Sequence, residues 1–169
     1  MEVLPDLYRI KKFREDKAEL HLVKVRKLLT IAIEERDQAQ KTLDDYEIYR
    51  KKQEAELFKN LYSRLVKIKD INEVSEDIKI MQDEVEKLSD VLSQMQEKLA
   101  KAKEAVEESK VLHQEAIRMR EKYSEALKIM AEEELIAMQL SEELGMEESF
   151  VLPNNQNDYF KSSIDGVHG

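Results

Sequence analysis

The stretch INEVSEDIKIMQDEVEKLSDVLSQMQEKLAKAKEAV, residues 71–106, decides the fold of this chain. Its apolar residues recur at alternating spacings of three and four, which is the pattern of core positions in a heptad repeat. A helix packed on a globular core would show a wider and less regular apolar stripe. The stretch therefore predicts one helix of a coiled coil. Its core positions are Ile71, Val74, Ile78, Met81, Val85, Leu88, Leu92, Met95, Leu99, Ala102 and Val106.

The apolar pattern changes after Val106. The next core positions in this register, Ser109 and His113, are polar, and apolar residues resume three residues out of step. An insertion of three residues is a stammer, which locally overwinds a coiled coil. The sequence therefore predicts a stammer directly after Val106. The resumed positions are Leu112, Ala116, Met119, Tyr123, Ala126 and Met130.

The first half of the chain carries a second, less regular seam. Arg36, Arg50 and Gln53 interrupt it, and between residues 20 and 33 further apolar residues lie off the line. That stretch either packs against two neighbours or presents a surface to a partner. The seam residues are Ala18, Leu22, Val25, Leu29, Ala32, Ala39, Leu43, Tyr46 and Leu57, and the residues off the line are Leu20, Val23, Leu28, Ile31 and Ile33.

A short turn separates the two halves. Apolar and lysine residues alternate over 66–69, which is not a helical pattern, and Asp70 followed by Glu73 is typical of a capping box with Asp70 as the cap. We predict helices over 6–64 and 71–144, joined by a turn near 65–71. Two long helices joined by a short turn pack antiparallel. The prediction is an all-α, two-helix antiparallel coiled-coil hairpin over 1–148, with Gly145 ending the helix and a flexible C-terminal tail over 149–169.

Composition supports long helices and excludes several classes of protein. No Gly or Pro lies between Pro5 and Gly145, and charged residues make up 38% of the chain, against ~25% in an average domain. The periodic apolar residues distinguish it from a disordered chain. Absence of Cys excludes disulfides, thiolate metal sites and cysteine catalysis. The net charge of −9 argues against nucleic acid as a partner. No signal peptide or membrane span is visible, so we expect a soluble cytosolic protein.

No constellation of residues indicates catalysis. His21, His113 and His168 are widely separated, so neither a metal site nor a catalytic histidine is expected. Paired carboxylates such as Asp44 and Asp45 are typical of solvated helix faces. A hairpin of two helices also offers no enclosed pocket of the kind that enzymes use. The sequence therefore predicts a protein that is not an enzyme and that needs no cofactor.

Two other features point to partner proteins. Residues 132–148 contain seven Glu and no Lys or Arg, which suggests either a basic partner or the repulsion of an alternative partner. Four aromatic residues gather in the half of the first helix that is nearer the turn. They either broaden the seam there or form an exposed recognition patch, since aromatic residues are favoured at interfaces. The four are Tyr46, Tyr49, Phe58 and Tyr62.

Three segments in order resemble one family. They are LYRIKKFREDKA at 7–18, the turn segment at 61–74 with VKIKDINEV at its end, and HQEAIRMREKYSEAL at 113–127, followed by the acidic end at 132–148. Together they resemble the YscO family of bacterial type III secretion proteins, which is similar in role to the flagellar FliJ protein. The resemblance spans residues 4–148 and does not include the tail after Ser149.

The resemblance implies a cytoplasmic, monomeric hairpin that acts as the central stalk of the secretion ATPase. The open end would enter the pore of the ATPase hexamer, and the turn end would point to the cytoplasmic ring of the export gate. Binding of export chaperones is also implied, without nucleic acid contact or membrane insertion. Tyr46, Tyr49, Phe58 and Tyr62 are the candidate gate contacts. The candidate ATPase contacts are Arg9, Lys11, Lys12, Arg14, Lys17, Arg118, Arg120, Lys122 and Glu125.

Two other functions stay open at this point. The chain could be a generic coiled-coil scaffold or tether that dimerises in parallel through residues 71–106. It could instead be a helical chaperone or adaptor that uses the apolar surface at 20–33 and the acidic end. The mass in solution separates the stalk from the scaffold. Binding of an ATPase rather than of export substrates separates the stalk from the chaperone.

Overall fold

The chain forms two long helices, α1, Val3–Tyr62, and α2, Ile68–Val167. The computed structural model describes the backbone of residues 3–63 and 67–167, and the side chains of 3–63 and 67–147. No strand occurs in these ranges, which confirms the all-α prediction. The chain divides into two compact units: residues 14–116, and residues 1–13 together with 117–169.

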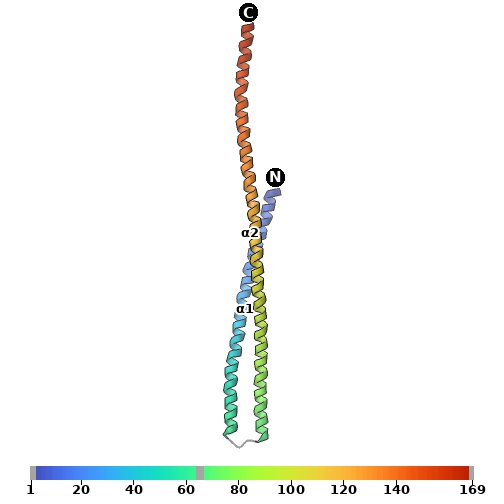
Figure 1. Cartoon of the computed structure of the whole chain (residues 1–169), viewed down its shortest axis with the longest axis vertical. Coiled ribbons are helices and arrows are strands. Elements are labelled where there is room, and N and C mark those ends of the chain that lie inside the picture. The colour runs from blue at the N-terminus through green and yellow to red at the C-terminus, as the bar shows by residue number, and fades with distance from the viewer. Residues whose placement is uncertain (1–2, 64–66, 168–169) are drawn as a thin grey trace. The chain divides into compact units, whose positions relative to one another are not determined.

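In the unit formed by residues 14–116, α1 and α2 run antiparallel (Figure 1). Leu22 and Val25 of α1 pack against Val106 of α2. Further along the same pair, the Nζ atom of Lys98 lies 2.7 Å from Oε2 of Glu35. These contacts confirm the helical hairpin. They also show that α1 of the same chain covers the seam of 71–106 that a parallel dimer would need.

The residues predicted for the seam supply its core. Ile71 is the exception, because half of it is exposed and the covered seam begins at Val74. The three interruptions, Arg36, Arg50 and Gln53, are half-buried and so remain in the seam. The buried apolar side chains, all of which the heptad pattern predicts, are Leu22, Val25, Ala32, Leu43, Met81, Leu92, Leu99 and Val106.

The predicted stammer after Val106 is wrong. Ser109 is only 2% exposed and His113 is half-buried, whereas Leu112 is exposed. The original register thus continues, and farther along α2 the half-buried Arg120 and Leu127 keep the same spacing. Ser109 is tolerated in the seam because it is small and because its Oγ lies 3.1 Å from Nδ1 of His21. A buried hydroxyl with a hydrogen-bond partner carries little of the desolvation penalty of an unpaired one.

The turn lies close to its predicted place, but its cap differs. Helix α1 ends at Tyr62 and helix α2 begins at Ile68. Residues 64–66, which overlap the predicted turn, lie outside the described residues. Asp70 is not the cap residue. Its carboxylate Oδ2 accepts a hydrogen bond of 3.1 Å from the backbone N–H of Lys67, three residues earlier. Asp70 therefore fills the acidic third position of a capping box, where its charge also favours the helix N-terminus.

In the other unit, the first residues of α1 pair with α2. The ammonium group of Lys11 lies 5.6 Å from the ring centroid of Tyr123, and Leu4, Tyr8 and Leu127 are half-buried. Beyond these contacts, every side chain of residues 131–147 is exposed.

The second helix is longer than predicted. It begins at Ile68 rather than residue 71, and it continues through Gly145 to Val167 instead of ending at Leu144. Gly145 does not adopt the positive φ that a glycine cap requires. A single Gly costs about 1 kcal/mol in a helix, which the surrounding strong helix formers offset. The flexibility of residues 149–169, and a single hairpin domain over 1–148, stay predictions.

Candidate partner-binding surfaces

The candidate ATPase contacts divide between the two units. Arg14 and Lys17 belong to the unit of residues 14–116, and the other seven belong to the unit of 1–13 and 117–169. Most of these side chains are exposed, but Lys11 and Arg120 are half-buried. The Lys11 ammonium faces the Tyr123 ring, a cation–π geometry that favours a structural role for that residue. Arg9 lies 3.8 Å from Asp6 in an exposed pair.

Glu15, which lies among the candidate Lys and Arg contacts of α1, was not predicted from the sequence to be buried. Glu15 is buried, with 8% of its surface exposed. It occupies a seam position, because it precedes Ala18 by three residues and Leu22 by seven. The sequence signal was available, since continuing the heptad spacing backwards from Leu22 reaches residue 15.

The acidic segment of α2 is also strongly apolar at its surface. Six large apolar side chains between residues 135 and 146 are each at least 54% exposed. At about 100° per residue, neighbours such as Leu135 and Ile136 project from different sides of the helix. The segment is therefore apolar on more than one face, with glutamates interspersed. The six are Leu135, Ile136, Met138, Leu140, Leu144 and Met146.

The four aromatic residues form two separate pairs. The rings of Tyr46 and Tyr49 lie 5.7 Å apart, tilted by 44°, and line a groove of about 310 Å³ together with Asp77 and Ile80 of α2. Partial burial raises the pKa of Tyr46 above its ordinary value, and the negative charge of Glu84 adds to the effect. Phe58 and Tyr62 instead line a shallow hollow formed by the last residues of α1 and by Ser63, which follows it. Tyr62, at 87% exposure, is open to a partner.

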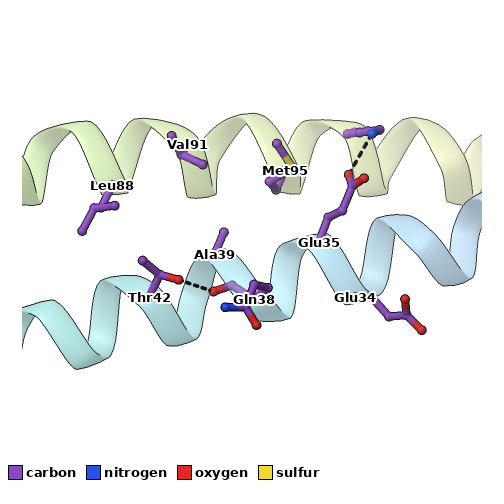
Figure 2. A pocket seen from close by; sticks show the side chains of 9 residues that line it. Glu34, Glu35, Gln38, Ala39, Thr42, Leu88, Val91 and Met95 are labelled. Atoms are coloured by element: carbon purple, nitrogen blue, oxygen red, sulfur yellow. Dashed lines mark hydrogen bonds and ion pairs between the residues drawn. The ribbon is translucent and has the colours of Figure 1, made fainter.

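A larger groove, not anticipated from the sequence, runs between the helices beside Ala39 (Figure 2). Its volume is about 620 Å³. Ala39 occupies a core position but ends at Cβ, so Leu88 and Met95, which line the same groove, are only partly buried. The floor is apolar, and charged groups stand at the rim. The lining residues are Glu34, Glu35, Gln38, Ala39 and Thr42 of α1 and Leu88, Val91, Met95 and Lys98 of α2.

The described side chains show neither a metal site nor a membrane span. Across residues 3–63 and 67–147, no three His, Cys, Asp or Glu residues are grouped so that they could hold a metal ion. Within the part of the chain that the structure describes, neither helix carries the uninterrupted apolar stretch needed to span a bilayer. What the surfaces offer is a set of exposed apolar side chains with acidic neighbours, which is the composition of interaction sites.

Comparisons with known proteins agree with the sequence resemblance. A family profile described as "Type III secretion protein YscO" matches residues 4–152. The crystal structure of type III secretion protein YscO from Vibrio parahaemolyticus has a similar fold, with a TM-score of 0.79 and 20% sequence identity. The alignment covers 87% of this chain and 92% of that one. A comparison with curated protein sequences found no significant match.

Proposed function

Because the chain belongs to the YscO family of type III secretion proteins, we propose that it acts as the central stalk of the secretion ATPase. In this role it links the ATPase hexamer to the cytoplasmic ring of the export gate, at the cytoplasmic face of the apparatus, and binds export chaperones. Membership in the family makes the chain a component of type III secretion. The stalk, its contacts and its location are the proposal.

The observation that carries the proposal is the exposed segment of residues 131–147. A helix that is apolar on several faces is normally buried on several faces. Every described side chain of this segment is exposed. A partner that surrounds the helix would cover all of these faces at once, and the pore of an ATPase hexamer is such a partner. The glutamates among the apolar residues favour a pore with basic groups.

The pairing of α1 with α2 supports a stalk over a scaffold. The apolar seam of residues 74–106 is covered within the chain, so a parallel dimer through that seam would require the hairpin to open. A two-helix coiled coil is also stiff and narrow, as a stalk must be. At the turn, the exposed Phe58 and Tyr62 are available for the export gate.

The test of the ATPase contact uses the secretion ATPase encoded with this chain. Purified wild-type protein is expected to stimulate ATP hydrolysis and hexamer formation. The double variant Ile136→Lys with Leu140→Lys should lose most of the stimulation, because two apolar contacts become positive charges that face the basic groups of the pore. Both side chains are exposed, so the fold is retained. Val111→Lys is the control, since Val111 is 55% exposed and lies outside the segment.

Charge reversal separates the candidate basic contacts from the rest of the surface. Arg14→Glu and Arg118→Glu should reduce the stimulation, whereas Lys101→Glu, an exposed residue outside the candidate set, should not. An absence of binding by a dimeric protein would overturn the stalk and leave the scaffold. An absence of binding by a monomeric protein would favour a chaperone or adaptor.

The gate contact is tested independently of the ATPase. Phe58→Ala with Tyr62→Ala should weaken binding to the purified cytoplasmic domain of the export gate at least tenfold. The same variant should stimulate the ATPase normally. Ile48→Ala, which replaces another exposed apolar residue of α1, is the control. Unchanged gate binding by the double variant would remove the aromatic pair from the proposed contact.

A further inference from the structure

The groove beside Ala39 and the groove beside Tyr49 lie on one side of the hairpin. On α1 the first groove is lined by Glu35, Gln38 and Thr42, and the second by Tyr46 and Tyr49. These positions follow spacings of three and four, which place them on one face of the helix. The two grooves therefore form one surface, which we call the groove face. It belongs wholly to the unit of residues 14–116.

The groove face is more apolar than a solvated coiled-coil flank. Val91 is 43% exposed and Ile80 is 61% exposed, and both stand where a simple two-helix coil carries charged residues. On α1, Leu28 and Ile31 continue the face, because they precede Glu35 by seven and four residues. Both are about half exposed. Apolar residues flanking a seam provide a second seam, into which a third helix can pack.

The charges of the groove face define the partner. The two grooves are lined by three carboxylates, Glu34, Glu35 and Asp77, and by one ammonium group, that of Lys98. Lys98 is already engaged, because its Nζ lies 2.7 Å from Oε2 of Glu35. Glu34 points away from α2 and stands at the rim (Figure 2). A second copy of this chain would place the same carboxylates opposite one another, so charge disfavours self-association here.

We propose that the groove face is a docking site for one basic amphipathic α-helix of another protein. Its apolar side chains would enter the groove beside Ala39 and cover Val91, while Lys or Arg residues on its flanks would pair with Glu34 and Asp77. From Glu34 to Gln53 the face spans about 28 Å at 1.5 Å per residue, which a helix of about 19 residues matches. The site is independent of the proposed stalk contact at residues 131–147.

A synthetic helix tests the groove face directly. The probe is a fluorescently labelled peptide of about 19 residues, with Leu at three–four spacing and Lys on both flanks, and its affinity for the full-length protein is measured by anisotropy. Thr42→Arg and Val91→Lys are each expected to weaken binding at least tenfold. A peptide with Glu in place of Lys is expected to bind at least tenfold more weakly than the basic peptide.

The chain offers closely matched controls. Thr30, like Thr42, is exposed and donates its hydroxyl to the carbonyl of the residue four positions earlier, but it does not line the groove. Val111, like Val91, is an exposed valine of α2 outside the groove. Thr30→Arg and Val111→Lys should keep the affinity within twofold. Circular dichroism of all four variants reports whether the hairpin is retained.

Several results would overturn the proposal. It fails if the basic peptide does not bind, if the acidic peptide binds equally well, or if the groove variants bind as the controls do. Self-association of the protein that Val91→Lys abolishes would assign the face to a second copy instead. Peptide binding to the groove face does not depend on ATPase stimulation. The docking site and the stalk contact at residues 131–147 can therefore fail independently of each other.

A second measurement uses the apparatus in the bacterium that encodes the chain. A photocrosslinking amino acid is placed at residue 42 and, as the control, at residue 30, and the crosslinked peptides are identified by mass spectrometry. Residue 42 should link to a Lys- or Arg-rich amphipathic segment, and residue 30 should not. A link from residue 42 to an acidic segment, or to another copy of this chain, would contradict the assignment.

Discussion

At the scale of single residues, the contact between Ser109 and His21 explains why a polar residue occupies a core position of the seam. The two residues are 88 positions apart, and their side chains meet at 3.1 Å across the helices. The heptad pattern of α2 alone favours Leu112 over Ser109 as the next core residue. The partner that makes Ser109 acceptable belongs to α1, so the local pattern could not reveal it. The pattern was sufficient where the seam is wholly apolar, as at Leu92 and Leu99.

Leu92→Ala should be among the more damaging single changes to the hairpin. Leu92 is 9% exposed, and truncating a buried leucine costs about 2–5 kcal/mol through lost burial and the cavity left behind. Val111→Ala removes an exposed side chain and should change the free energy of unfolding by less than about 0.5 kcal/mol. Urea denaturation followed by circular dichroism measures both. Equal effects of the two changes would contradict the seam assignment.

The hairpin should lose stability in alkali partly through Tyr46. Burial and the charge of Glu84 raise its pKa above 10.0, so folding favours the protonated phenol. That contribution is complete below the ordinary tyrosine pKa and disappears as the pH rises through the raised value. The free energy of unfolding should therefore begin to fall as the pH approaches about 10, the ordinary tyrosine pKa, and should keep falling until the pH has passed the raised pKa of Tyr46. Tyr46→Phe should reduce this fall, whereas Ile48→Ala, an exposed change on the same helix that removes no ionisable group, should leave it unchanged.

At the scale of elements, the continuity of α2 through Gly145 shows that a single glycine does not by itself end a helix. Gly145 is the first Gly or Pro after Pro5, and this isolation made it the expected helix end. A cap needs a left-handed backbone at the glycine and partners for the last carbonyl groups. Neither requirement can be read from one residue type, whereas the strong helix formers on both sides favour continuation. The turn was easier to place, because several residues in sequence depart from helical spacing.

Gly145→Ala tests the continuous helix. A Cβ atom at this position would meet no atom within 4 Å, and the backbone does not have positive φ. Alanine should therefore stabilise the local helix by about 1 kcal/mol and slow amide hydrogen exchange of the neighbouring residues about fivefold. Faster exchange in the variant would show that Gly145 instead caps the helix in the left-handed conformation. Ala131→Gly, at another exposed position of the same segment, should act in the opposite direction.

At the scale of the whole molecule, pairing within one chain has a consequence for its mass. The seam that would hold a dimer together is used by α1 and α2 of the same copy. Sedimentation equilibrium should therefore give the monomer mass of 19.9 kDa, independent of protein concentration. The thermal midpoint should likewise not change with concentration, as it would for a dimer. A mass near twice this value that Val91→Lys leaves unchanged would contradict the hairpin as the form in solution.

The antiparallel pairing also sets the order in which the chain can fold during its synthesis. Leu22 and Val25 find their packing partner in Val106, so the ribosome must add about 80 residues before this part of the core can close. At about 5–20 residues per second, that takes several seconds. The contacts nearest the turn can form first, and the pairing of α1 with α2 then extends from the turn toward the amino terminus. During that interval the apolar stripe of the nascent first helix is uncovered, which makes early translation the step most exposed to misassociation.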